Sequence, residues 1–71
     1  MTTRTSKKQM HEVDELFRAT FPNGMVYAAG EYNASASAYI RLNGEVTRYA
    51  NNTEAMEAAL EMMFEHDMEA M

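Results

Sequence analysis

The sequence contains no cysteine and no tryptophan, and it has only one proline and three glycines in 71 residues. Without cysteine, neither a disulfide framework nor a thiolate metal site can stabilise so short a chain. A hydrophobic fraction of 46% nevertheless allows a compact core and argues against disorder. We therefore expect one domain over residues 1–71, with a flexible N-terminus at 1–5 and a frayed end at 68–71. This length is near the lower limit for independent folding, which leaves a homodimer open.

Long apolar runs are also missing. No stretch approaches the roughly 18 residues that a membrane-spanning helix needs. The segment 1–8 is basic, but no apolar run follows it, so it does not have the pattern of a signal peptide. Together with the lack of cysteine, this predicts a cytoplasmic protein with no membrane partner.

Basic residues are few: the chain has 6 Lys and Arg against 11 Asp and Glu, for a net charge of −5 at pH 7. Phosphate binding needs clustered Lys and Arg, and here they are scattered over three segments. The pattern therefore argues against direct binding of nucleic acid. The acidity is concentrated at the C-terminal end, where no Lys or Arg occurs from Thr53 onward.

Residues 6–20 have the pattern of a helix. Ser6 and Gln9 form a capping-box pair at its start. Pro22 and Gly24 end it, because proline disfavours helical geometry before it and glycine permits positive φ. The apolar spacing places one set of side chains on the buried face, with Leu16 at the edge. This set is Met10, Val13, Phe17 and Thr20 or Phe21.

Three strands are predicted next, over residues 25–32, 36–42 and 45–50. The second alternates between apolar and polar residues, and Asn43-Gly44 after it is a strong hairpin signal. A two-residue loop would place Ile40 opposite Thr47. A three-residue loop with a bulge would place Ile40 opposite Val46 on the buried face, and Arg41 opposite Glu45. We favour the bulged register, because it joins two branched apolar residues and opposes opposite charges.

The last segment is predicted to be a helix from about residue 53 to the high sixties, capped by Asn51-Asn52-Thr53. Asp67 falls in the middle of its predicted apolar stripe, so the packed part is expected to end near His66. The residues of this stripe are Met56, Ala59, Leu60, Met63 and Phe64.

These elements predict an α+β fold: a helix, a three-stranded antiparallel sheet and a helix, in two layers with both helices on one face of the sheet. The element order and the length resemble the double-stranded RNA-binding domain. That family has a lysine cluster at the start of its second helix, where this chain has Asn52-Thr53-Glu54-Ala55-Met56-Glu57. The resemblance therefore implies the topology, and no functional residue of that family is carried over.

The final helix carries Glu57, Glu61, Glu65 and Glu69 at intervals of four, with Glu54 on the same side. Like charges at this spacing destabilise a helix by about 0.2–0.5 kcal/mol per pair. Acidic residues near a helix C-terminus also oppose the macrodipole. One interpretation is a solvated face, or one neutralised by arginines elsewhere in the chain. The other is an anionic ridge for a basic partner, since four helical residues rise about 6 Å, comparable to the spacing of phosphates along a nucleic-acid strand.

Two further groups of residues are candidate sites. In either register Tyr39 and Arg41 point away from the core, where they suit a protein contact or stacking on bases. Thioethers and imidazole suit Cu(I), but methionine is also a common filler of small cores, and we predict no metal and no cofactor. The methionine-rich group consists of Met62, Met63, His66, Met68 and Met71.

No arrangement of residues indicates catalysis. Neither His11 nor His66 has an adjacent serine or an orienting carboxylate implied by spacing, and no glycine-rich phosphate loop is present. We therefore predict a non-enzymatic protein with no catalytic residues.

The sequence thus predicts a small acidic inhibitor or regulator that presents its acidic helix, together with Tyr39 and Arg41, to a basic partner protein. One such partner is a protein that normally handles nucleic acid, and phage anti-defence proteins such as anti-CRISPR or anti-restriction nucleic-acid mimics offer an analogy of type. The alternative is an assembly module that self-associates through exposed Met62 and Met68 together with Tyr39 and Tyr49 on the outer face of the sheet. A more distant alternative is an RNA-binding domain of the topology named above.

Overall fold

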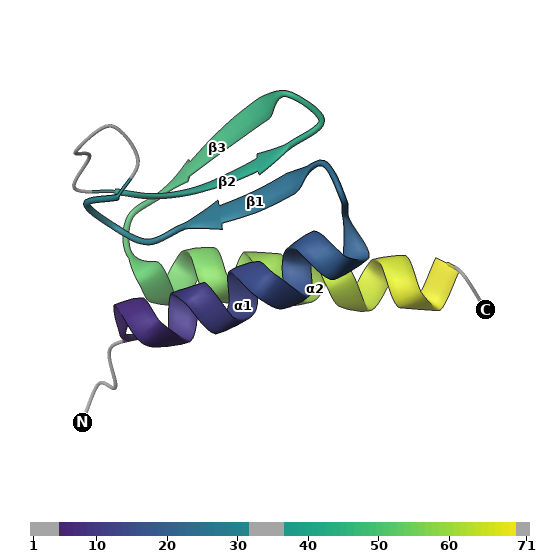
Figure 1. The fold of residues 1–71 in the computed structure, drawn as a ribbon, viewed down its shortest axis with the longest axis horizontal. Helices are drawn as coiled ribbons and strands as arrows, with labels where there is room; N and C mark the ends of the chain where they lie inside the picture. Colours follow the sequence, from purple (N-terminus) through teal and green to yellow (C-terminus); the bar gives the residue numbers. More distant parts are fainter. Residues whose placement is uncertain (1–4, 32–36, 70–71) are drawn as a thin grey trace.

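The computed structural model describes residues 5–31 and 37–69. The strands form one antiparallel sheet in the order β1-β2-β3, and both helices lie side by side on the same face of it (Figure 1). The predicted two-layer α+β fold is confirmed. The elements are α1 (Lys7–Thr20), β1 (Gly24–Tyr27), β2 (Ala38–Leu42), β3 (Glu45–Tyr49) and α2 (Asn52–Glu69).

Helix α1 begins and ends as its sequence predicts. The backbone N–H of Gln9 donates to Ser6 Oγ at 3.1 Å, and the backbone N–H of Ser6 donates to Gln9 Oε1 at 2.8 Å, which completes the capping box. After the last turn the backbone turns sharply into β1. A Cβ on Gly24 would lie only 2.5 Å from Cε2 of the buried Phe17, so β1 can start over that ring only because Gly24 has no side chain.

Strand β1 ends at Tyr27, earlier than the predicted range 25–32. Gly30 has φ 87° and the N–H of Glu31 donates to the carbonyl of Ala28 at 3.1 Å, so the chain leaves the sheet in a turn. Residues 32–36 lie outside the described part of the chain, and with them the start of the predicted strand 36–42. Within the described part, β2 begins at Ala38.

The β2–β3 hairpin has a two-residue loop, so the bulged register that we favoured is wrong. Leu42 lies opposite Glu45, and Ile40 lies opposite Thr47. Asn43 and Gly44 have φ of 52° and 86°, which is the pair of positive values that a type I′ turn requires. This type of turn matches the twist of the strands. The free energy gained from the turn is greater than that gained from the pairing of branched residues in the bulged register.

Helix α2 is rotated relative to the predicted orientation. Leu60 and Phe64, predicted to be buried, are 44% and 66% exposed. Ala59 and Met63 are buried as predicted, and Ala55 joins them on the buried face, because small side chains let α2 approach both α1 and the sheet closely. The core consists of Met10, Val13, Phe17, Val26, Ala28, Ala38, Ile40, Ala55, Ala59 and Met63.

The predicted orientation places Asp67 among the buried apolar side chains, and the observed rotation moves it away from them. In the observed orientation Asp67 is well exposed, and His66 lies against Phe21, just after α1. The ring of His66 meets the ring of Phe21 edge-on, with 5.0 Å between centroids. Packing therefore reaches His66, as expected, and α2 continues as a helix to Glu69, beyond the end of α1 (Figure 1).

Polar side chains fix the other end of the helix pair. Asn52 accepts a hydrogen bond from the N–H of Ala29 at 2.7 Å and donates to the carbonyl of Thr5 at 3.2 Å. The hydroxyls of Thr5 and Thr53 lie 3.0 Å apart. Thr5, which fell in the segment expected to be flexible, is therefore buried and anchored; residues 1–4 and 70–71 are outside the described part.

Asp14 is the buried carboxylate that joins α1 to the sheet. Its Oδ1 accepts a hydrogen bond from the backbone N–H of Val26 at 2.8 Å, and its Oδ2 lies 2.6 Å from Nη2 of Arg18. A buried N–H without a hydrogen-bond partner costs free energy. The hydrogen bond from Val26 therefore satisfies both the backbone N–H in β1 and the carboxylate of Asp14.

Replacing Asp14 with Ala should reduce the free energy of unfolding by about 1–3 kcal/mol, because the Val26 N–H loses its buried acceptor. Urea unfolding measures this change. The matched control is Glu15→Ala, the exposed neighbour on the same helix, which should change the value by less than about 0.5 kcal/mol. Equal effects of the two substitutions would contradict this role for Asp14.

Glu31 forms a second polar contact between α1 and the end of β1. Its carboxylate lies 2.7 Å from Nε2 of His11 and 3.9 Å from Nζ of Lys7, and it accepts from the N–H of Ala28 at 3.1 Å. Partial burial raises the pKa of Glu31. The hydrogen bonds from His11 and Ala28 and the charges of His11 and Lys7 act in the opposite direction and prevail, so the pKa lies below its ordinary value of 4.5.

A carboxyl group with a lowered pKa in the folded state stabilises the fold above its ordinary pKa, and this contribution is lost as pH falls through the lowered value. Glu31→Gln should therefore destabilise the protein near pH 7, and the difference from wild type should shrink as the pH approaches about 3. Urea unfolding at both pH values tests this. A difference that stays constant with pH would mean that the charge of Glu31 contributes nothing.

Candidate protein-binding face

The side of α2 turned away from α1 and the sheet carries two neighbouring rows of exposed side chains. We call this side the outward face of α2. One row is acidic and the other is apolar, and each has the four-residue spacing that aligns side chains along a helix. The acidic row is Glu57, Glu61, Glu65 and Glu69 with Glu54 beside it, and the apolar row is Leu60, Phe64 and Met68.

The predicted acidic residues are thus brought together, but the apolar row was missed. Phe64 is 66% exposed and Met68 is 54% exposed. These exposed fractions are high for large apolar side chains. The sequence did hold a signal for this arrangement. Asp67 falls in the middle of the predicted stripe, whereas a stripe centred on Ala59 avoids it.

The carboxylates of the acidic row have no cationic partner within the described residues. The ion pairs found there join Lys7 and His11 to Glu31, Arg18 to Asp14, and His66 to Asp67. None of them reaches the acidic row. The interpretation in which arginines of the chain neutralise this helix therefore has no support in the part of the chain that the structure describes.

Glu54 differs from the rest of the row because it takes part in capping the helix. Its N–H donates to Asn51 Oδ1 at 2.9 Å, and its carboxylate accepts from Asn51 Nδ2 at 3.3 Å. An acidic residue in the first turn also suits the helix dipole. At the other end, Glu65 and Glu69 oppose the dipole, and His66 is the only basic residue of the last turn.

Tyr39 and Arg41, also predicted to bind the partner, lie away from α2 on the outer face of the sheet. Arg41 is exposed, but Tyr39 is only 8% exposed and Arg48 lies over its ring, 5.7 Å from the centroid. Tyr49 pairs with Ala38 and packs against the core, so its expected place on the outer face is wrong. The predicted site residues therefore divide between two faces.

The methionine-rich group is likewise divided. Met63 is buried in the core, Met62 packs partly against it, and Met68 is exposed on the outward face of α2. His66 lies against Phe21, and Met71 is outside the described residues. The side chains that the structure describes serve different packing roles and do not converge on one point.

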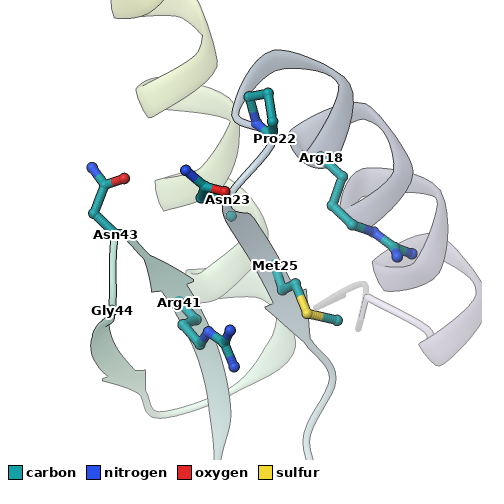
Figure 2. Close-up of a pocket in the computed structure, with 8 residues that line it drawn as sticks. Arg18, Pro22, Asn23, Met25, Arg41, Asn43 and Gly44 are labelled. Carbon is teal, nitrogen blue, oxygen red and sulfur yellow. The ribbon is translucent and has the colours of Figure 1, made fainter.

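An open hollow of about 470 Å³ lies where the α1–β1 connection meets the hairpin turn. Figure 2 shows Met25 and Arg41 side by side on neighbouring strands, with Arg18 beyond Met25 on α1. The hollow is shallow and polar, and it brings together basic and amide groups without a nucleophile.

Comparison with protein-family models, with curated proteins and with solved structures gives no match. Over the described residues, no helix combines the length and the apolar character needed to cross a membrane.

Replacing Glu57, Glu61 and Glu65 together with Gln should increase the free energy of unfolding by about 1 kcal/mol, because three repelling pairs along α2 are relieved. The control is Glu12, Glu15 and Glu45 replaced with Gln, which changes the net charge equally at exposed positions elsewhere. Urea unfolding at low salt compares the two variants. An equal gain in both would attribute the effect to net charge and not to the row.

Proposed function

We propose that this protein acts without catalysis, as a small regulator or inhibitor that binds another protein through the outward face of α2. The partner presents a basic surface to Glu57, Glu61 and Glu65. The observation that carries this proposal is the row of exposed carboxylates without a cationic partner among the described residues. A row that repels itself is better explained by an external cation than by folding.

The exposed apolar row supports a protein as the partner. Phe64 and Leu60 lie beside the glutamates, and apolar anchors flanked by charge are typical of a helix that docks in a groove. In this arrangement the glutamates steer the encounter and the apolar side chains supply most of the affinity.

The finer proposal is that the partner's basic surface normally handles nucleic acid, and that the action is in the cytoplasm. The spacing of about 6 Å between successive glutamates supports this, since it allows them to stand in for phosphates. Anti-CRISPR and anti-restriction proteins of phages offer an analogy of type for a small acidic protein of this kind. Self-association through Met and Tyr surfaces has less support, because Tyr39 is buried and Tyr49 is partly buried against the core.

Affinity capture from the native host tests the proposal. Immobilised wild-type protein should retain a basic protein at low salt and release it as ionic strength rises, because exposed charges are screened. Glu57, Glu61 and Glu65 replaced with Gln should abolish retention. Duplex DNA or RNA added as competitor should displace the partner if its basic surface handles nucleic acid.

The variant with Glu12, Glu15 and Glu45 replaced with Gln is the matched control, because it loses the same charge and keeps the outward face of α2. It should retain the partner as wild type does. If both variants capture the same protein equally, the acidic row is a solvated surface and the proposal fails.

A further inference from the structure

The outer face of the sheet is a second surface that neither helix covers (Figure 1). Both helices lie on the opposite side, so no helix shields this face (Figure 1). Paired residues of neighbouring antiparallel strands point to the same side, which identifies the side chains of this face. They form two rows across the sheet: Met25, Arg41 and Val46, and Tyr27, Tyr39 and Arg48.

The charged strand residues on this face are both arginines. Arg41 and Arg48 are exposed, and neither forms an ion pair within the described residues. Arg48 lies over the ring of Tyr39, which orients its guanidinium group along the face. Three acidic residues, Asp14, Glu15 and Glu31, line a hollow at the β1 edge of this face. Asp14 is paired with Arg18, and Glu31 with His11 and Lys7. This face is therefore a small basic surface on an acidic protein.

Apolar groups accompany the arginines. Val46 is 44% exposed, and Met25 beside Arg41 is partly exposed (Figure 2). This surface is therefore complementary in charge to the outward face of α2. That face combines carboxylates with exposed Phe64 and Leu60 and has no Lys or Arg. Each of the two faces carries charge of one sign together with apolar side chains.

We infer that copies of this protein associate head to tail, with the outward face of α2 of one copy on the outer sheet face of the next. Symmetric contacts are disfavoured, since α2 against α2 would oppose glutamates and sheet against sheet would oppose arginines. Because the two surfaces differ, a pair of copies keeps one free α2 face at one end and one free sheet face at the other, and the contact can repeat. The pairing places Glu57, Glu61 and Glu65 against Arg41 and Arg48.

Sedimentation equilibrium of the purified protein tests this inference without any other partner. Wild type should show a mass that rises with concentration between about 10 μM and about 1 mM at low salt. The rise should be suppressed at about 500 mM salt, where exposed charges are screened. Arg41→Glu and Glu61→Arg should each weaken the association by about tenfold or more, because each places like charges in contact.

An equimolar mixture of the two variants is the decisive sample. The unchanged Glu61 face of the Arg41→Glu protein meets the unchanged Arg41 face of the Glu61→Arg protein, so the mixture should associate although neither variant does alone. The controls are Lys8→Glu and Glu12→Arg on α1, which make the same charge changes and should associate as wild type does. Circular dichroism confirms folding; if Arg41→Glu unfolds, Arg41→Gln replaces it and should weaken association less.

A wild-type protein that stays monomeric throughout this range at low salt would overturn the inference. So would association that neither variant weakens, or a mixture no better than its components. The inference does not rest on the proposed function, since the sample contains this chain alone. Its failure would leave the capture experiment with a host partner unaffected.

Discussion

The fold depends on the close approach of α2 to its neighbours, which two fully buried alanines permit. Ala55 and Ala59 lie one turn apart and face both α1 and the sheet. A larger side chain at either position would force the layers apart, because protein interiors are packed almost without voids. The same constraint applies where Gly24 passes over Phe17. Once the small residues occupy the contact, Leu60 and Phe64 are turned to the outside.

Contacts at both ends hold α2 in this orientation. Asn52 and Thr53 bind the segment before α1, and His66 packs on Phe21 just after it. The two helices therefore lie parallel and are joined near each end of α1. A face held in this way loses little conformational entropy when it binds, so its side chains are better placed for recognition than those of a free helix.

The element order, the capping box and the hairpin turn follow from the sequence because each depends on local chemistry. The orientation of α2 does not, since apolar spacing gives a period and leaves open which of two neighbouring stripes is buried. Leu60 and Phe64 have the greater hydrophobicity, but Ala55 and Ala59 have the size that the contact requires. The exposure of the glutamates could be predicted from their charge; the exposure of Phe64 could not.

The pairing of Ile40 with Val46 favours the bulged hairpin register when the strands alone are considered and the turn is neglected. The positive φ values available to Asn43 and Gly44 fix a two-residue loop, and every partner along β3 shifts by one position. Val46 then moves to the outer face and Tyr49 to the core. One local backbone preference thus decides which side chains of β3 lie on the outer face of the sheet.

The position of the glutamates next to the apolar row has a consequence for selectivity. An exposed Phe64 alone would attract any apolar surface and favour aggregation. Carboxylates beside it repel acidic surfaces and are costly to desolvate against neutral ones, so a basic surface is the kind that can reach the ring with a net gain. The repulsion that weakens α2 and the exposure of Phe64 are each unfavourable for a monomer. In the proposed function, the two together would let the contact discriminate by charge before it gains affinity from burial.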